Sequence, residues 1–320
     1  MTTSTSPCKL AVVGAGALGS YYGARLARSG EDVHFLMRGD LVAVRERGIT
    51  VSYPGEKFHL TPARLHAAAT PEEIGACDIV LVTLKTTANN SFRQLITPLL
   101  RENTAIITLQ NGLGSDEQLA ALFGTERILG ALCFICVNRL APGVIDCTST
   151  GTISFGEYQR PATARLRAIA EKFTRAGIKA TVHDNLAELR WRKLIWNVPF
   201  NGLSIAAGGI TTDKIMADPA LEAESRALMQ EIAAAAAAHG FTIPDTFIQK
   251  QLDITRPMGA YRPSSLLDYL ARREVEVESI WGEPLRQARS KNVPTPRLAL
   301  LHALLRALTE LPGNSRNNVN

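Results

Sequence analysis

The sequence has no apolar segment that reaches the ~20 residues needed to span a bilayer. Residues 1–7 are rich in Ser and Thr and lack the apolar core of a secretory signal. The last nine residues, 312–320, are polar and are expected to be disordered. We therefore expect a cytoplasmic protein with no membrane partner.

Cysteine is scarce, with five residues in a chain of 320. An odd number in a chain of this size argues against a disulfide framework and for a reducing compartment. Cys133 and Cys136 lie in an apolar, strand-like run, so we interpret them as buried strand residues and not as a redox pair. The six histidines show no metal-ligand spacing, and we expect no metal site.

Charge is also sparse, because Asp, Glu, Lys and Arg make up 20% of the residues and the net charge is +5. The basic residues are scattered without a long run, which excludes a typical nucleic-acid partner. A small positive excess suits a phosphate-bearing cofactor and an anionic substrate. With 46% hydrophobic residues, the chain can form two domains with cores of their own.

A glycine-rich turn near the start of the chain is the most informative motif. The apolar strand 10–13 leads into Gly14-Ala15-Gly16-Ala17-Leu18-Gly19, and an amphipathic helical pattern follows over 18–28. In such a turn the first glycine allows a sharp bend, the second allows close approach to a pyrophosphate, and the third allows the helix to pack on the strand. The helix N-terminus also attracts anions. This context favours a dinucleotide-binding turn over an ordinary glycine turn.

The remaining pattern predicts two domains. Strands are expected at 9–13, 33–37, 49–53, 57–60, 79–83, 104–109, 128–137, 143–148 and 152–155, and helices at 18–28, 41–47, 90–100 and 115–123. This alternation predicts an α/β, doubly wound Rossmann-type domain over residues 1–184. Helices expected at 187–201, 219–239, 244–252, 266–287 and 296–308 predict an all-helical substrate-binding and catalytic domain over 185–320.

Three polar residues follow predicted strands of the first domain. Arg38 stands where an NAD-binding site would place an acidic residue, and its guanidinium suits the 2′-phosphate of NADP. Asp40, two residues later, counts against this interpretation. Lys85 and Asn111 follow central strands, so we expect them near the crevice at the carboxyl ends. Asn111 also fits a plain Asn-Gly turn.

Polar residues also recur along one predicted helix of the second domain. Lys193, Asn197 and Asn201 are spaced four residues apart, which places them on one stripe. On so apolar a helix we expect this stripe to face a polar cavity, although a solvated face is the alternative. Among Glu274, Glu276 and Glu278 most are expected to be solvated, and one could meet Lys193.

Taken in order, several motifs resemble one family. They are Gly14–Gly19, Arg38, Leu84-Lys85-Thr86, Gln110-Asn111-Gly112, the run 193–201, Ser264-Ser265 with Asp268, the run 276–282, and Val293-Pro-Thr-Pro296. The chain resembles the ketopantoate reductases (2-dehydropantoate 2-reductases), which use NADPH to make pantoate. The resemblance covers nearly the whole chain.

The resemblance implies roles for these residues. Lys193 matches the family's proton donor, and Glu276 matches a glutamate that binds substrate and positions the lysine. Asn197 and Asn201 match residues that hold the substrate's hydroxyl and carboxylate. A serine matching Ser264 or Ser265 shares that task.

The resemblance further implies that Arg38 binds the 2′-phosphate and that Lys85 and Asn111 line the cofactor cleft. The chain departs from the family near Thr211, where a substrate-binding asparagine is missing, and at Trp281, where Asn is frequent. One residue is also missing between Ser265 and Glu276. The alternatives are a reductase or dehydrogenase of another 2-keto or hydroxy acid, and a non-catalytic NADP-binding regulator. A homodimer is compatible with the sequence.

Overall fold

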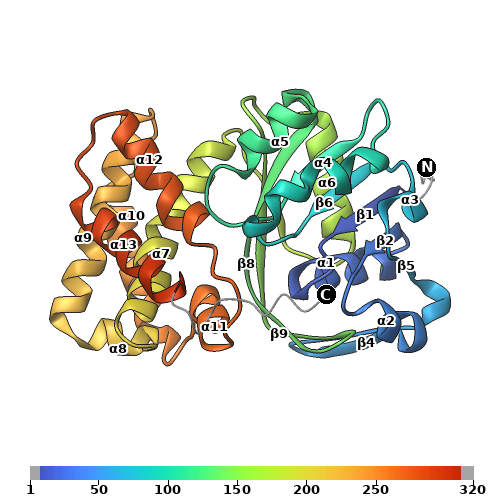
Figure 1. The fold of residues 1–320 in the computed structure, drawn as a ribbon, viewed down its shortest axis with the longest axis horizontal. Coiled ribbons are helices and arrows are strands. Elements are labelled where there is room, and N and C mark those ends of the chain that lie inside the picture. Colours follow the sequence, from blue (N-terminus) through green and yellow to red (C-terminus); the bar gives the residue numbers. More distant parts are fainter. Residues whose placement is uncertain (1–7, 311–320) are drawn as a thin grey trace. The chain divides into compact units, whose positions relative to one another are not determined.

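The computed structural model describes residues 8–310, which form one ten-stranded sheet and a separate group of helices (Figure 1). In chain order the strands are β1 (Lys9–Val13), β2 (Asp32–Leu36), β3 (Ile49–Tyr53), β4 (Glu56–Leu60), β5 (His66–Ala68), β6 (Ile79–Val82), β7 (Ala105–Thr108), β8 (Ile128–Ala141), β9 (Val144–Glu157) and β10 (Ala180–Val182). No helix in this described range combines the length and apolarity that crossing a membrane would require.

The α-helices divide between the two halves of the chain. Those of the first half are α1 (Ala17–Arg28), α2 (Leu41–Arg47), α3 (Pro71–Ile74), α4 (Phe92–Ile96), α5 (Ser115–Phe123) and α6 (Ala164–Arg175). Those of the second half are α7 (Leu186–Ala206), α8 (Thr212–Ala217), α9 (Pro219–Ala238), α10 (Asp245–Thr255), α11 (Ser264–Leu270), α12 (Glu283–Ser290) and α13 (Pro296–Glu310). A π-helical turn, Glu278–Gly282, leads directly into α12.

The sheet is mostly parallel and carries helices on both faces. Its strand order is β4-β3-β9-β8-β7-β6-β1-β2-β5, with β10 beside β9, and only the pairs β3–β4 and β8–β9 are antiparallel. Residues alternate between two apolar cores, Val12 and Phe35 on one face and Val13 and Leu36 on the other. This arrangement confirms the predicted doubly wound α/β fold, with the carboxyl ends of β1, β2, β6 and β7 at a common edge.

The chain separates into two compact units. The sheet unit contains the residues up to Gln110 and Ser115–Leu186, and the helical unit contains Ala187 onward. A four-residue segment from the first half, Asn111–Gly114, belongs to the helical unit. The predicted all-helical fold of the second half is confirmed, because α7 to α13 enclose one apolar core of their own.

Several local predictions were wrong. The predicted helix 90–100 is a short α4 flanked by 3-10 turns, because Pro98 has no N–H for a longer ladder. The predicted strands 143–148 and 152–155 are one strand, β9, which pairs with β8 through β-bulges. Cys133 and Cys136 lie on β8 as predicted, but they are only half-buried. Helix α6 was not predicted.

The predicted helix 266–287 is also wrong, because α11 ends at Leu270. Arg272 adopts a left-handed conformation, with φ of +52°, which stops the helix. Asp268 closes the turn by accepting hydrogen bonds from Arg273, at 2.8 Å to its carbonyl and 3.0 Å to its carboxylate. Helical structure resumes only at Glu278. This break separates the serine pair from the glutamates and places them on different elements.

Candidate functional site

The predicted site residues fall into two groups, and the first surrounds the glycine turn of the sheet unit. Gly14 has φ of +97°, and a Cβ there would lie 2.6 Å from the backbone nitrogen of Leu84. A Cβ on Gly19 would overlap the hydroxyl of Thr83, which donates to the carbonyl of Gly14 at 2.7 Å. These two glycines therefore let the turn pack against the end of β6.

Gly16 differs, because no atom lies within 4 Å of a Cβ built on it. Its backbone leads directly into α1, so Ala17 and Leu18 occupy the first helical turn beside Ala15. The N–H groups at a helix N-terminus have no partner within the helix and attract anions. The open space at Gly16 is what an approaching pyrophosphate group would need.

Arg38 and Lys85 lie at the same edge of the sheet, at the carboxyl ends of β2 and β6, and both side chains are exposed. Asp40 does not share this exposure. It is buried, forms an ion pair with Arg139, and accepts a hydrogen bond from the Gly143 backbone at 3.4 Å. Asp40 is therefore engaged with the β8–β9 hairpin.

The second group lies in the helical unit, on α7 and its neighbours. Lys193 donates from Nζ to the Asn111 side-chain oxygen at 2.8 Å. Asn197 and Asn201 are 8% and 1% exposed. The alternative of a solvated stripe therefore does not describe the asparagines, since an amide buried on an apolar helix needs polar partners.

Asn201 holds the start of α11. Its side-chain oxygen accepts from the Ser265 backbone N–H at 2.9 Å and from the Ser264 hydroxyl at 3.5 Å. This contact satisfies an N–H of the first turn, as a helix cap does. Ser264 is exposed, whereas Ser265 is buried.

The segment Asn111–Gly114 reaches Lys193 because it docks on the π-helical turn. Leu113 donates its backbone N–H to the carbonyl of Ser279 at 2.9 Å, and its side chain joins the helical core. Gly112 has φ of +83°, and a Cβ there would overlap the carbonyl of Ser279. Only glycine allows this approach without a shift of the backbone. The docking fixes Asn111 beside the ammonium of Lys193.

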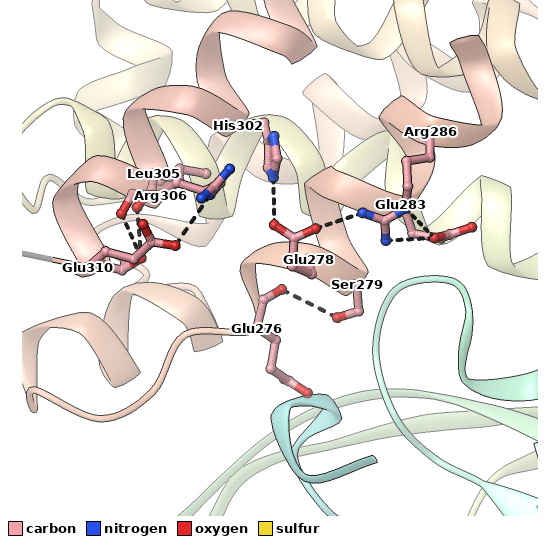
Figure 2. A network of polar contacts seen from close by, with 10 residues as sticks. Glu276, Glu278, Ser279, Glu283, Arg286, His302, Leu305, Arg306 and Glu310 are labelled. Carbon is pink, nitrogen blue, oxygen red and sulfur yellow. Dashed lines mark hydrogen bonds and ion pairs between the residues drawn. The ribbon is translucent and has the colours of Figure 1, made fainter. Parts of the chain in front are cut away.

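The three glutamates of the run 274–278 differ in their exposure to solvent. Glu274 and Glu278 are exposed and Glu276 is 7% exposed, so two of the three are solvated, as expected for most of them, and Glu276 is the exception. In Figure 2 the Glu276 side chain points away from the cluster around Glu278. Burial thus singles out Glu276 among the three as the carboxylate suited to a site.

Glu278 belongs instead to an ion-pair network (Figure 2). Its carboxylate contacts Arg286 at 2.7 Å and His302 at 2.9 Å. Partial burial raises the pKa of Glu278, but the hydrogen bonds from Arg286 and His302 outweigh it and hold the pKa below its usual value. The network ties the π-helical turn to α12 and α13, which supports the surface on which Gly112 docks.

Trp281, at the position where the family often has Asn, belongs to the core of the helical unit. Its side chain is fully buried in the helical core, and its indole N–H donates to the Val198 carbonyl at 2.9 Å. A Cβ on Gly202 would lie 2.9 Å from that indole nitrogen, so α7 and the π-helical turn pack closely. Sequence reasoning missed Ser279 and this turn, since no periodicity marks a π-helix.

Comparisons with known proteins agree with the motifs. The family model described as ketopantoate reductase PanE/ApbA matches residues 10–160, and its C-terminal model matches residues 185–309. A 2-dehydropantoate 2-reductase of Nostoc sp. is 38% identical over 305 residues, covering 94% of this chain and 95% of the relative.

Solved structures share the whole fold. The 2-dehydropantoate 2-reductase of Geobacter metallireducens is 42% identical, covers 93% of this chain and 99% of its own, and superposes with a TM-score of 0.91. D-mandelate dehydrogenase in a ternary structure with NADH and anilino(oxo)acetate is 21% identical, covers 94% and 98%, and gives a TM-score of 0.86, which shows a shared fold. The chain therefore belongs to the ketopantoate reductase family, a family of nicotinamide-dependent oxidoreductases.

Proposed function

We propose that the protein reduces 2-dehydropantoate (ketopantoate) to pantoate with NADPH, as a cytoplasmic step of pantothenate biosynthesis. The observation that carries this proposal is the stripe of Lys193, Asn197 and Asn201 on α7, whose lysine contacts Asn111, in a chain of the ketopantoate reductase family. A non-catalytic regulator would need a cofactor site but no positioned ammonium. The stripe therefore favours an enzyme.

The sheet unit fits a nicotinamide dinucleotide carrying a 2′-phosphate. The open space at Gly16 and the N-terminus of α1 suit the pyrophosphate, and Lys85 lies at the same sheet edge. Arg38 is the exposed charge after β2, and its forked guanidinium suits a phosphate better than a ribose hydroxyl. When bound, the cofactor supplies the hydride for the C2 carbonyl.

Arg38→Ala is expected to raise the KM for NADPH and leave the KM for NADH nearly unchanged. Losing one charge-assisted contact costs about 1.5–3 kcal/mol, or roughly ten- to hundredfold in affinity. Steady-state kinetics with both cofactors provide the measurement. Arg47→Ala is the matched control, since Arg47 is an exposed arginine in the next helix. Equal use of NADH and NADPH by the unaltered protein would contradict the cofactor assignment.

The proposed mechanism uses Lys193 as the general acid. As hydride reaches C2, negative charge grows on the carbonyl oxygen, and a positioned ammonium stabilises that charge and then transfers a proton to it. The contact with Asn111 at 2.8 Å orients the ammonium. Glu276 binds the substrate hydroxyl and helps position the lysine. The amides of Asn197 and Asn201, with Ser264 or Ser265, hold the hydroxyl and carboxylate.

Replacement of the proton donor should separate chemistry from binding. Lys193→Ala is expected to reduce kcat by roughly 10²–10⁴-fold, the usual contribution of a positioned acid. NADPH affinity, measured by fluorescence titration, should persist. Lys214→Ala, which removes an exposed lysine from the same unit, should change kcat less than twofold. Unchanged turnover in Lys193→Ala would refute the assignment.

The substrate is the finer part of the proposal. Asn197, Asn201 and the serine pair offer neutral hydrogen-bonding groups that suit a hydroxylated keto acid. Near Thr211 the chain lacks an asparagine that binds substrate in the family, so one expected substrate contact is absent. This departure supports a second candidate function, the reduction of another 2-keto acid on the same architecture. The fold is shared with D-mandelate dehydrogenase, so fold does not decide between them.

Comparison of kcat/KM for ketopantoate and 2-ketoisovalerate tests the proposed function. The second compound lacks the hydroxymethyl group, and a site built around a hydroxyl rejects such analogues because its own polar groups are left unpaired. We expect a preference for ketopantoate of about a hundredfold or more. The rates are measured through the loss of NADPH absorbance. Equal rates would favour the second candidate. No oxidation of NADPH with either acid would favour a regulator.

A further inference from the structure

Two histidines and an aspartate gather at an edge of the sheet that the proposed reaction does not use. Asp32 and His34 are two residues apart on β2, so their side chains leave the same face of the sheet. His66 on the neighbouring edge strand β5 is the register partner of His34. Alternation along one strand and pairing across to the next therefore bring the three side chains together.

The potential ligand atoms converge. The Nε2 atom of His34 lies 3.0 Å from an Asp32 carboxylate oxygen, and the Nε2 atom of His66 lies 3.6 Å from the same oxygen. One ligand atom from each residue lies within 4.8 Å of the other two. A tetrahedral ion with bonds of about 2.1 Å holds its ligand atoms about 3.4 Å apart. The observed separations bracket that value.

The rings leave room for coordination. The imidazoles of His34 and His66 stack with centroids 4.5 Å apart and planes 17° apart. A shared ion requires one ring to turn until its lone pair points at the ion. His66 has this freedom, because its side chain is 61% exposed on an edge strand. Both histidines, but not Asp32, also line a cavity of about 340 Å³, which has space for a water molecule beside the histidine pair.

We propose that Asp32, His34 and His66 form a binding site for a divalent transition-metal ion, with Zn²⁺ as the reference ion. Two imidazoles and one carboxylate are borderline ligands that suit zinc, and the water-accessible cavity supplies the fourth position. This proposal departs from the expectation, based on linear spacing, that the chain has no metal site. Linear spacing missed it because the third ligand lies 32 positions beyond His34.

The local charges permit a cation. The Asp32 carboxylate offsets part of the ion's charge. Nearby Lys9 directs its ammonium to the Ile74 carbonyl at 2.5 Å, and Arg45 pairs with Glu73 at 2.8 Å. Burial lowers the pKa of His34, and the proximity of His66 and Lys9 adds to this while Asp32 opposes it. The neutral imidazole is the form of histidine that binds metal.

An ion here would join the outermost strand to the sheet. Strand β5 has only three residues and pairs with β2 alone among the described strands. The site lies toward the start of β2, whereas Arg38 follows the end of that strand. Metal binding is thus expected to stabilise the edge of the sheet and to be separate from the cofactor end.

Calorimetric titration of the full-length, tag-free protein with Zn²⁺ alone tests the site. We expect one saturable site with micromolar or tighter affinity near pH 7, together with a higher melting temperature in zinc. At pH 5.5 binding should weaken, because the ordinary imidazole pKa is about 6.5 and the metal must then displace protons. Co²⁺ substitution reports the coordination through its visible absorption.

Variants locate the site. His66→Ala, at an exposed position, should weaken Zn²⁺ binding by at least roughly tenfold, and Asp32→Asn should also weaken it. His59→Ala is the matched control, because His59 lies on β4 of the same sheet and outside the cluster. Burial raises the pKa of Cys8 and Cys77 to about 11, which disfavours zinc binding by these thiols near pH 7. Absence of saturable binding, or affinity unchanged in His66→Ala, would overturn the proposal.

Discussion

The docking of four residues onto the helical unit is the constraint on which the proposed chemistry depends. Asn111–Gly114 leaves the end of β7, and the Leu113 N–H binds the Ser279 carbonyl at 2.9 Å. Glycine at position 112 is required because any side chain would overlap that carbonyl. This contact places Asn111 against the ammonium of Lys193. A turn 82 positions earlier in the chain therefore supplies a hydrogen-bond acceptor for Lys193, the residue proposed as the general acid.

The rest of the helical unit supports that contact. The π-helical turn presents the Ser279 carbonyl outside the regular helical pattern, as such turns often do at functional sites. Trp281 binds the Val198 carbonyl of α7, and the pairs of Glu278 with Arg286 and His302 hold the turn from its other side. Asn201 in turn fixes the start of α11. The Trp281 indole N–H and the Asn201 side-chain oxygen can be buried because each has a hydrogen-bond partner within the unit.

The sequence predicted those parts of the fold and site that follow from local rules. The strand, glycine turn and helix at residues 9–28 follow from periodicity and from glycine's freedom, and α2, α5 and the strands β3 and β4 were predicted closely. The end of α11 at Arg272 was missed because a left-handed arginine carries no compositional signal. The contacts of Asn111 with Lys193 and of Asn201 with Ser265 join distant segments, so spacing could indicate the residues but not their partners.

A double-mutant cycle on kcat tests most directly whether Lys193 and Asn111 act as one unit. Lys193→Ala, Asn111→Ala and the double variant would be compared at saturating NADPH and ketopantoate, so that differences in affinity do not contribute. The account predicts strong non-additivity, with the double variant within about twofold of Lys193→Ala, because Asn111 acts by holding the lysine. Effects that multiply independently would contradict it, since Asn111 would then serve the reaction without Lys193.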